Sequence, residues 1–312
     1  MKTRKKISKT KNRNSFKSMQ EPLVSVIIPV FNAGEFLREA IESILYQTYK
    51  NFEFIIVDDC STDGSWKIIK SYQKKYPAKI KTIRLKKNLN RGGDSCANLA
   101  IKRAKGKYIA RMDADDIAVI DKLEKQVEFL EENPDIFLVG SNAHVINTKG
   151  IIIGEKLEPL KHKDIYNSYA RFHPIIHPTS MFRRLINGKR FFYQISYSAN
   201  NDYHTFFKLI CTGFRFANLK EKLIYYRIHS GNDTFINMKD KFMNTLKIRI
   251  KMFLHYNYKP SLKDIFTSFV QLILLFLLPE KITKDLYLIS KGIIKFKDFL
   301  VPLQRLIPFS VN

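Results

Sequence analysis

Cysteine is scarce in this chain, and the few cysteines show no recognisable spacing. Cys60, Cys96 and Cys211 are the only three in 312 residues, and they form none of the closely spaced pairs that zinc sites or disulfide frameworks contain. An odd number of scattered thiols favours a reducing compartment such as the cytosol. The sequence therefore predicts neither a disulfide-stabilised domain nor thiol redox chemistry.

The glycine patterns of the common nucleotide-binding loops are also missing. The turn VFNAGEF contains only Gly34, whereas a dinucleotide site needs the Gly-x-Gly-x-x-Gly fingerprint after its first strand, and no Walker A sequence occurs. An EF-hand calcium loop starting at Asp113 is excluded as well. Ile117 and Ala118 occupy the positions in it that need an oxygen ligand and a glycine. Phosphate binding by a glycine-rich loop is therefore not expected.

The sequence contains no apolar run of the length that a bilayer-spanning helix needs. The run IFTSFVQLILLFLLP at residues 265–279 has about fifteen residues, and a spanning helix needs roughly twenty. Flanked by Lys263, Lys281 and Lys284, it fits an anchor lying in the membrane interface. It fits a buried or oligomer-forming core helix equally well. No apolar segment follows the basic N-terminal residues, so we expect no secretory signal peptide.

Acidic residues are few, with 29 Asp and Glu against 54 Lys and Arg, which gives a formal net charge of +25. Such an excess favours an anionic partner, namely nucleic acid, acidic lipid or an anionic substrate. Residues 1–22 carry eight Lys or Arg against Glu21 and are expected to form a disordered basic arm. No helix-turn-helix, zinc spacing or RNP-type motif appears, so specific nucleic-acid recognition is not expected.

One acidic cluster stands out against this basic background. The stretch ARMDADDIAV places Asp113, Asp115 and Asp116 directly after an apolar run. Two carboxylates about 4 Å apart repel each other by on the order of 4 kcal/mol at an effective dielectric near 20. The cluster must therefore be either solvated or compensated by a cation.

The rest of the chain alternates between strand and helix patterns. Continuous apolar runs such as VSVIIPV predict strands buried on both faces, and apolar residues at helical spacing follow each run. This order predicts an α/β fold, Rossmann-like, with a mostly parallel sheet that has helices on both faces and a helical C-terminal region. The strands are expected at 24–30, 52–57, 80–84 and 107–112. The helices are expected after the turn FNAG, with Leu37, Ile41, Ile44 and Leu45 at helical spacing, within 61–76 after initial capping residues, at about 94–104 and from about Val119.

Carboxylates follow two of these strands at equivalent positions. Asp58 and Asp59 end the second strand, and the cluster at 113–116 ends the fourth. Ligands of open parallel sheets bind beyond the carboxyl ends of the strands, so both groups are expected to face one crevice. A hard divalent cation held by few protein oxygens and completed by phosphate oxygens suits such a crevice. Asp59 is placed to accept a hydrogen bond from the N–H of a pyrimidine base.

Taken in order along the chain, four segments resemble a family 2 glycosyltransferase of the GT-A fold. They are VSVIIPVFNAGEFLREAIESILYQTYKNFEFIIVDDCSTDGS, NRGGDSCANLAIKRAKGKYIARMDADD, HPTSMFRR and YYRIHSGN, within residues 22–232. The resemblance implies metal-dependent transfer of a sugar from a nucleoside diphosphate donor, with a UDP-sugar favoured, to an acceptor hydroxyl with inversion. The implied acceptor is a saccharide or a lipid-linked molecule in cell-surface polysaccharide or glycan synthesis, and the implied cofactor is Mn²⁺ or Mg²⁺.

The same resemblance implies roles for single residues. Asp202 in ANNDYHTFFKL matches the catalytic base, although Asn201 and His204 replace acidic neighbours, so its pKa is expected to be less elevated than in relatives. His177 fits either a buried structural hydrogen bond or an acceptor contact, and the loop of Arg227 and His229 fits either a closing loop or a surface turn. The implied donor-nucleotide residues are Pro29, Phe31, Asn32, Asp59, Asn90, Asp113 and Ala114, the metal ligands are Asp113 and Asp115, and the candidate diphosphate or acceptor contacts are Asp116, His177, Arg227 and His229.

These patterns predict three parts of the chain. A basic arm at 1–22 precedes a GT-A domain at 23–235, with a nucleotide-binding half at 23–118 and an acceptor half at 119–235. Residues 236–312 form a helical region that is a candidate for membrane association. The chain is expected in the cytosol, peripheral at the cytosolic face of an anionic membrane. A non-catalytic binding protein of the same fold and a basic nucleic-acid-binding protein are the alternatives, and the oligomeric state is left open.

Overall fold

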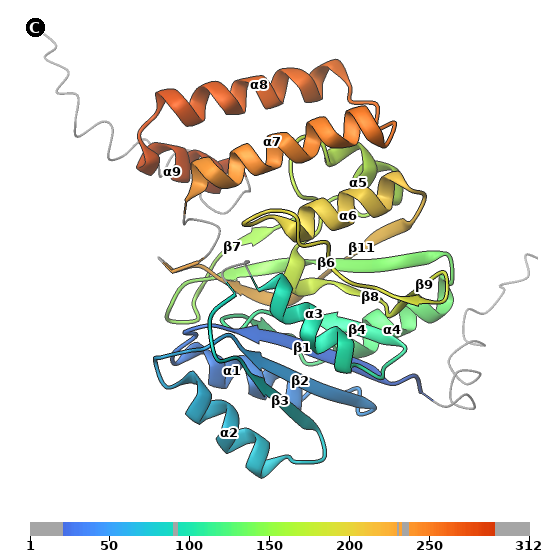
Figure 1. Ribbon diagram of the computed structural model, residues 1–312, viewed down its shortest axis with the longest axis vertical. Helices are drawn as coiled ribbons and strands as arrows, with labels where there is room; N and C mark the ends of the chain where they lie inside the picture. Colours follow the sequence, from blue (N-terminus) through green and yellow to red (C-terminus); the bar gives the residue numbers. More distant parts are fainter. Residues whose placement is uncertain (1–20, 90–92, 230, 233–236, 291–312) are drawn as a thin grey trace, which may run out of the picture.

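The computed structural model describes residues 21–89, 93–229, 231–232 and 237–290 and shows a layered α/β fold (Figure 1). The first strands form a parallel ladder in which β1 (Val24–Val30) lies between β2 (Phe52–Asp58) and β4 (Tyr108–Arg111). The edge strand β3 (Ile80–Arg84) pairs with β2 in parallel. These four strands confirm the predicted parallel arrangement, with boundaries within one residue of the predicted ones.

The second half of the sheet is mixed. The short β8 (Met181–Arg183) joins β4 to β6 (Ile136–Ile146) and is antiparallel to both. The long β11 (Arg215–Arg227) runs parallel to β6. Two further strands pair antiparallel with the sheet, β5 (Ile117–Ala118) with β11 and β7 (Ile152–Lys156) with β6. The strands β9 (Leu185–Ile186) and β10 (Lys189–Arg190) form a separate antiparallel ribbon.

Helices cover both faces of the sheet, as the apolar strands predict. Along β1, Val26 and Ile28 point into one core and Ile27 into the other, because successive side chains of a strand face opposite sides. The first core is completed by α1 (Phe36–Leu45), α2 (Ser65–Lys75) and α4 (Lys122–Glu132). The second is completed by α3 (Asp94–Arg103), α5 (His162–Ser168) and α6 (Asn201–Cys211).

One predicted boundary is wrong. We expected a helix from about Val119, but α4 begins at Lys122. The residues before it pair with other elements, since β5 adds to β11 and the N–H of Val119 donates to the carbonyl of Leu223. The backbone after the acidic cluster is therefore held at the sheet before the helix starts.

The C-terminal helices stack beyond α6 at one end of the molecule (Figure 1). They are α7 (Met238–His255), α8 (Leu262–Leu277) and α9 (Glu280–Ser290). In the described part of the chain, no helix combines the length and the apolar character that crossing a membrane would require. The predicted basic arm falls almost wholly outside the described residues, and the division into nucleotide-binding and acceptor halves stays a prediction.

Candidate functional site

A cavity of about 1610 Å³ lies beyond the carboxyl ends of β1, β2 and β4 and extends to α7, α8 and α9. The open-sheet argument predicts a crevice at this edge. Asp116 and Arg227 are not among the cavity-lining residues, and Asn90 lies outside the described residues. The predicted residues that do line the cavity are Pro29, Phe31, Asn32, Asp59, Asp113, Ala114, Asp115, His177, Asp202 and His229.

Two interlocked turns form the wall beside β1 and β2. Asn32 adopts a positive φ of 49°, and its side-chain oxygen accepts a hydrogen bond from the N–H of Thr62 at 2.8 Å. In return, the hydroxyl of Ser61 accepts from the N–H of Asn32 at 3.0 Å. Asn is among the few residues that tolerate this backbone region. The turns therefore hold the exposed ring of Phe31 at the cavity.

Asp59 is a buried carboxylate at the end of β2. Its Oδ1 accepts a hydrogen bond from the N–H of Leu89 at 2.9 Å, and its carbonyl oxygen accepts from Asn88. Burial raises the pKa of Asp59, and the nearby charge of Asp58 acts in the same direction. The side chain is thus fixed in place in the cavity wall at the end of β2.

The three carboxylates of the acidic cluster have separate partners. Asp113 accepts two hydrogen bonds on Oδ1 from the buried guanidinium of Arg111, at 2.9 and 3.2 Å. Asp115 has its Oδ2 3.0 Å from Nε2 of His229 and 3.3 Å from the amide nitrogen of Asn232. These donors therefore offset much of the electrostatic repulsion between the carboxylates.

The third carboxylate, Asp116, is buried away from the cavity together with Arg227. Its Oδ1 accepts the N–H of Arg227 at 2.8 Å, and burial raises the pKa of Asp116. The Arg227 side chain donates from Nε to the carbonyl of Asp115 at 2.8 Å, forms an ion pair with Glu39 and lies 4.6 Å from the ring centre of Phe36. In place of the predicted diphosphate or acceptor contact, we propose that both residues position the backbone of the acidic loop.

Asp113 and Asp115 fit a divalent cation. Both line the cavity, and each has one carboxylate oxygen without a hydrogen bond to any described residue. Among the described residues, no group of three or more His, Cys, Asp or Glu could hold a metal ion alone. Magnesium-type sites commonly use one or two carboxylates and take their other ligands from substrate phosphates and water.

Asp202 faces the same cavity from the first turn of α6. Its Oδ2 lies 3.3 Å from Nε2 of His173 and 3.5 Å from Nδ1 of His177. The second nitrogen of each ring has its own donor, since Nδ1 of His173 accepts from the N–H of Ile175 and Nε2 of His177 lies 2.9 Å from the hydroxyl of Tyr193. We therefore assign the ring proton of each histidine to the nitrogen that faces Asp202.

The two histidines explain the ionisation of Asp202. Burial alone would raise the pKa of Asp202, but His177 and His173 outweigh burial and hold the pKa below its ordinary value. Burial also lowers the pKa of His177 to about 3, so this ring is neutral at neutral pH. The expectation that the pKa of Asp202 is less elevated than in relatives stays a prediction.

Sequence reasoning missed Asp94 and His173. Asp94 is buried at the start of α3, accepts the N–H of Asp202 on Oδ2 at 3.1 Å, and has Oδ1 3.9 Å from Nε2 of His177. Burial and the charge of Asp202 raise the pKa of Asp94 well above its ordinary value. Asp94 thus supplies the acidic neighbour that the sequence around Asp202 lacks. The only sequence signals were the segment NRGGDS and the repeated histidine of HPIIHP.

Comparisons with known proteins identify the family of this chain. The family described as Glycosyl transferase family 2 matches residues 25–191. The uncharacterized glycosyltransferase MJ1057 of Methanocaldococcus jannaschii is 36% identical over 249 residues, which cover 79% of this chain and 81% of the relative. The Escherichia coli protein named UDP-Glc:alpha-D-GlcNAc-diphosphoundecaprenol beta-1,3-glucosyltransferase WfaP is 33% identical over 214 residues, which cover 67% of this chain and 79% of WfaP.

Two solved structures share the fold. TarS of S. aureus, residues 1–349 in complex with UDP, has a TM-score of 0.56 at 20% identity over 81% of this chain and 70% of that chain. The mannosyltransferase PcManGT from Pyrobaculum calidifontis, in complex with GDP-Man and Mn²⁺, has a TM-score of 0.57 at 18% identity over 92% and 85%. At these identities the likeness concerns the fold alone.

Proposed function

Because the chain belongs to glycosyl transferase family 2, we propose that it transfers a sugar from a nucleoside diphosphate donor to an acceptor hydroxyl with inversion, using Mn²⁺ or Mg²⁺. The observation that carries this proposal is the shared cavity. Asp113 and Asp115 reach it from the loop after β4, and Asp202 reaches it from α6. A UDP-sugar is the favoured donor, supported by the UDP-Glc in the name of WfaP.

The nucleotide would lie along the wall formed by the ends of β1 and β2. The exposed ring of Phe31 offers a face for stacking against the base, and the fixed carboxylate of Asp59 offers an acceptor for a base N–H. Pro29, Asn32 and Ala114 complete this wall. A divalent cation, when bound by Asp113 and Asp115, would stabilise the negative charge that grows on the departing diphosphate.

Asp202 would act as the base. The acceptor oxygen forms a bond to the anomeric carbon, the bond from that carbon to the diphosphate oxygen breaks, and the electron pair leaves with the nucleoside diphosphate. The acceptor proton passes to the Asp202 carboxylate. Because the pKa of Asp202 is held below its ordinary value, this side chain is ionised at neutral pH, which is the form that accepts a proton.

Replacing His173 by Phe tests the positioning of this base through the pH profile. The change removes the 3.3 Å contact between the ring and the carboxylate, one of the interactions that lower the pKa of Asp202, so that pKa should rise and the acid limb of the kcat/KM profile should move to higher pH. His204→Phe is the matched control, since His204 is buried on the same helix and has no contact with Asp202. An unchanged acid limb with a uniformly lower rate would make His173 structural only.

The function is tested by a donor screen. Nucleotide release is measured with uridine, guanosine and thymidine diphosphate sugars, each with Mn²⁺, Mg²⁺ or a chelator. We expect turnover with one class of donor, highest for a uridine diphosphate sugar, and loss of turnover with the chelator that added Mn²⁺ restores. Turnover that persists at full rate in chelator would contradict the metal-dependent mechanism.

The acceptor is proposed to be a saccharide or a lipid-linked molecule used in cell-surface glycan synthesis at the cytosolic face of a membrane. The names of two relatives support this, namely WfaP with its diphosphoundecaprenol acceptor and the putative teichuronic acid biosynthesis glycosyltransferase TuaG of Bacillus subtilis. TuaG is 43% identical over 117 residues, which cover 38% of this chain and 45% of TuaG.

A further inference from the structure

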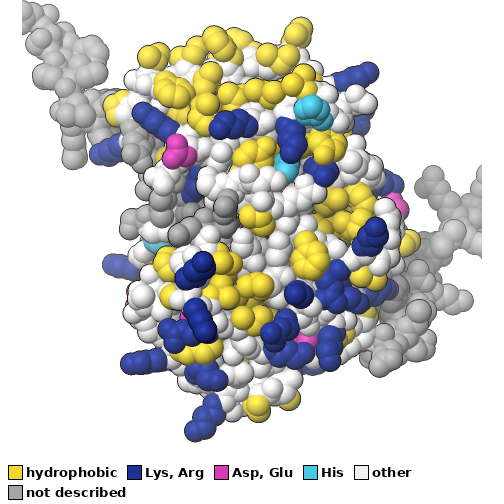
Figure 2. All heavy atoms as spheres, in the orientation of Figure 1, with side chains coloured by type: hydrophobic (Ala, Val, Ile, Leu, Met, Phe, Trp, Pro, Cys, Tyr) yellow, Lys and Arg dark blue, Asp and Glu magenta, His cyan; other side chains and the backbone are white. Residues whose placement is uncertain are grey.

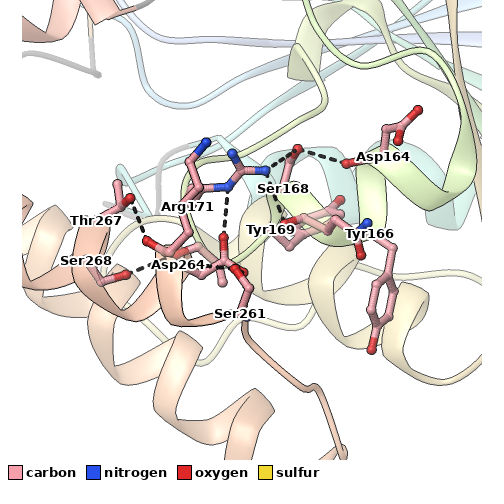
Figure 3. Close-up of polar contacts among 12 residues, drawn as sticks. Asp164, Tyr166, Ser168, Tyr169, Arg171, Ser261, Asp264, Thr267 and Ser268 are labelled. Carbon is pink, nitrogen blue, oxygen red and sulfur yellow. Dashed lines mark hydrogen bonds and ion pairs between the residues drawn. The ribbon is translucent and has the colours of Figure 1, made fainter.

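Helix α8 packs onto the protein with its polar side. Its first turn is closed by a capping box between Ser261 and Asp264, and the carboxylate of Asp264 also pairs with Nε of Arg171 at 2.9 Å (Figure 3). One turn further on, the hydroxyl of Ser268 donates to the carbonyl of Ala170 at 3.2 Å. These contacts fix the orientation of α8 through polar groups rather than through its many apolar side chains.

A second set of contacts continues the same polar side. Nη1 of Arg249 on α7 donates to Ser268 at 3.0 Å and to the side-chain oxygen of Gln271 at 3.2 Å. The amide nitrogen of Gln271 donates to the carbonyl of Arg171 at 3.3 Å. Arg249 is itself buried, so breaking these contacts to turn α8 around would leave the buried Nη1 of Arg249 without its two acceptors on α8.

The opposite side of α8 is apolar and exposed. Its residues recur at spacings of three and four, which place them on one helix face. Figure 2 shows hydrophobic side chains gathered over the end of the molecule that α8 forms. The exposed apolar residues here are Leu262, Ile265, Phe266, Phe269, Ile273, Leu274, Phe276 and Leu277 of α8, with Ile250 and Leu254 of α7, and Leu274 lies at the edge of this face.

Basic side chains border this apolar face. Lys259 and Lys263 are exposed at the start of α8, Lys281 is exposed just after its end, and Lys247 is exposed on α7. The only acidic residue within α8, Asp264, is turned inward and paired. If a second copy of this chain docked here, the lysines of the two copies would repel each other. An anionic lipid surface instead complements their charge.

The inner side of α8 also reaches the reaction cavity. Leu274 and Leu275 of α8, Phe242 of α7 and Leu286 of α9 line the same cavity as Asp115 and Asp202. The wall thus carries carboxylates near the sheet, and near the C-terminal helices these apolar side chains lie beside polar ones such as Thr245, Arg249 and Gln271. An acceptor that fits both ends has a polar saccharide near Asp202 and a hydrocarbon chain that reaches toward α8.

We propose that the apolar face of α8 and the end of α7 form a docking surface for an anionic bilayer, and that the acceptor is a lipid-linked saccharide delivered from that bilayer. The acceptor part rests on the proposed function, whereas the docking surface does not. Helix α8 has 16 residues, or about 24 Å of length, and its inner side is tied to the protein. It would thus lie in the interface plane rather than cross the membrane.

Vesicle flotation of the full chain tests the docking surface. The wild type should float with phosphatidylcholine vesicles that contain phosphatidylglycerol and much less with phosphatidylcholine alone, and salt should weaken binding. Phe266→Ser with Phe269→Ser should lower the partition constant at least about tenfold. The matched control is Tyr46→Ser with Ile120→Ser, since these residues are 61% and 59% exposed against 68% and 58% for the phenylalanines.

Two outcomes of flotation would overturn the docking surface. One is a wild type that stays unbound, and the other is a double variant on α8 that binds as tightly as the control. The oligomeric state is measured in parallel by light scattering. A wild-type dimer that becomes a monomer in the α8 variant, without any vesicle binding, would assign the surface to a second copy.

A transfer assay separates the acceptor from the surface. The same saccharide is supplied with a lipid carrier in vesicles or without a carrier in solution. With the vesicle acceptor, the transfer rate of the α8 variant should fall at least about tenfold. Its donor affinity and its transfer rate with the soluble acceptor should stay unchanged. Equal wild-type rates with both acceptors would overturn the lipid-linked acceptor. Vesicle binding without any donor turnover would leave the docking surface standing and refute the proposed function.

Discussion

Replacing Asp202 by Asn is expected to lower kcat for sugar transfer by roughly 10²–10⁴-fold, the usual contribution of a general base, while donor affinity stays nearly unchanged. The amide has almost the shape of the carboxylate, and its oxygen can keep the contacts with His173 and His177 at 3.3 and 3.5 Å. Only the capacity to take the acceptor proton is lost. Donor affinity is measured by calorimetry, and transfer is measured in a single-turnover assay.

The control for this variant is Asp164→Asn, because Asp164 is exposed on α5 and lies outside the cavity wall. The same experiment separates an enzyme from a non-catalytic binding protein of this fold. A binding protein would show donor affinity without transfer in the wild type, and the Asp202 variant would then change nothing. Transfer at the wild-type rate in the Asp202 variant would move the role of base to another group.

Strand prediction succeeded where burial on both faces left a simple pattern. The run Val24–Val30 is apolar at every position except Ser25 and Pro29, because α1, α2 and α4 cover one face and α3 covers the other. The same strand pattern places these carboxylates at the ends of their strands. Asp59, Asp113 and Asp115 were therefore expected at one edge of the sheet. They do line one cavity.

The contacts around the base could not be predicted from spacing. Asp94 and Asp202 are 108 positions apart, and they meet because α3 and α6 pack on the same face of the sheet. The burial of Arg227 could not be predicted from the sequence either, because its partners come from α1, the acidic loop and the turn after β6. Such side chains acquire their role from packing between elements, which a linear pattern does not encode.

Helix α8 shows a related limit of sequence patterns. Its periodicity separates an apolar face from a polar one, but periodicity does not say which face meets the protein. Apolar packing against the core is the usual arrangement. Here Asp264, Ser268 and Gln271 face inward because Arg171 and Arg249 supply partners there. The choice between a core helix and an interfacial one thus depends on two arginines outside the helix.

Replacing Asp115 by Asn should lower kcat/KM for transfer by on the order of 10²–10³-fold, because an interaction that stabilises the leaving diphosphate is lost. The amide oxygen can still accept from His229 and Asn232, which contact Asp115 in the absence of ligand. The loop should therefore keep its shape. The loss should appear both as weaker Mn²⁺ binding in the presence of donor, measured by calorimetry, and as a slower rate at saturating Mn²⁺.

Asp121→Asn is the matched control for this substitution. It makes the same chemical change six positions later, at a residue that pairs with Lys125 and does not line the cavity. Its transfer rate and its Mn²⁺ requirement should match those of the wild type. If Asp115→Asn keeps the wild-type affinity for Mn²⁺ but loses transfer, Asp115 would act on the substrate directly. The contact between Asp115 and His229 would then mark a substrate-positioning pair rather than a metal site.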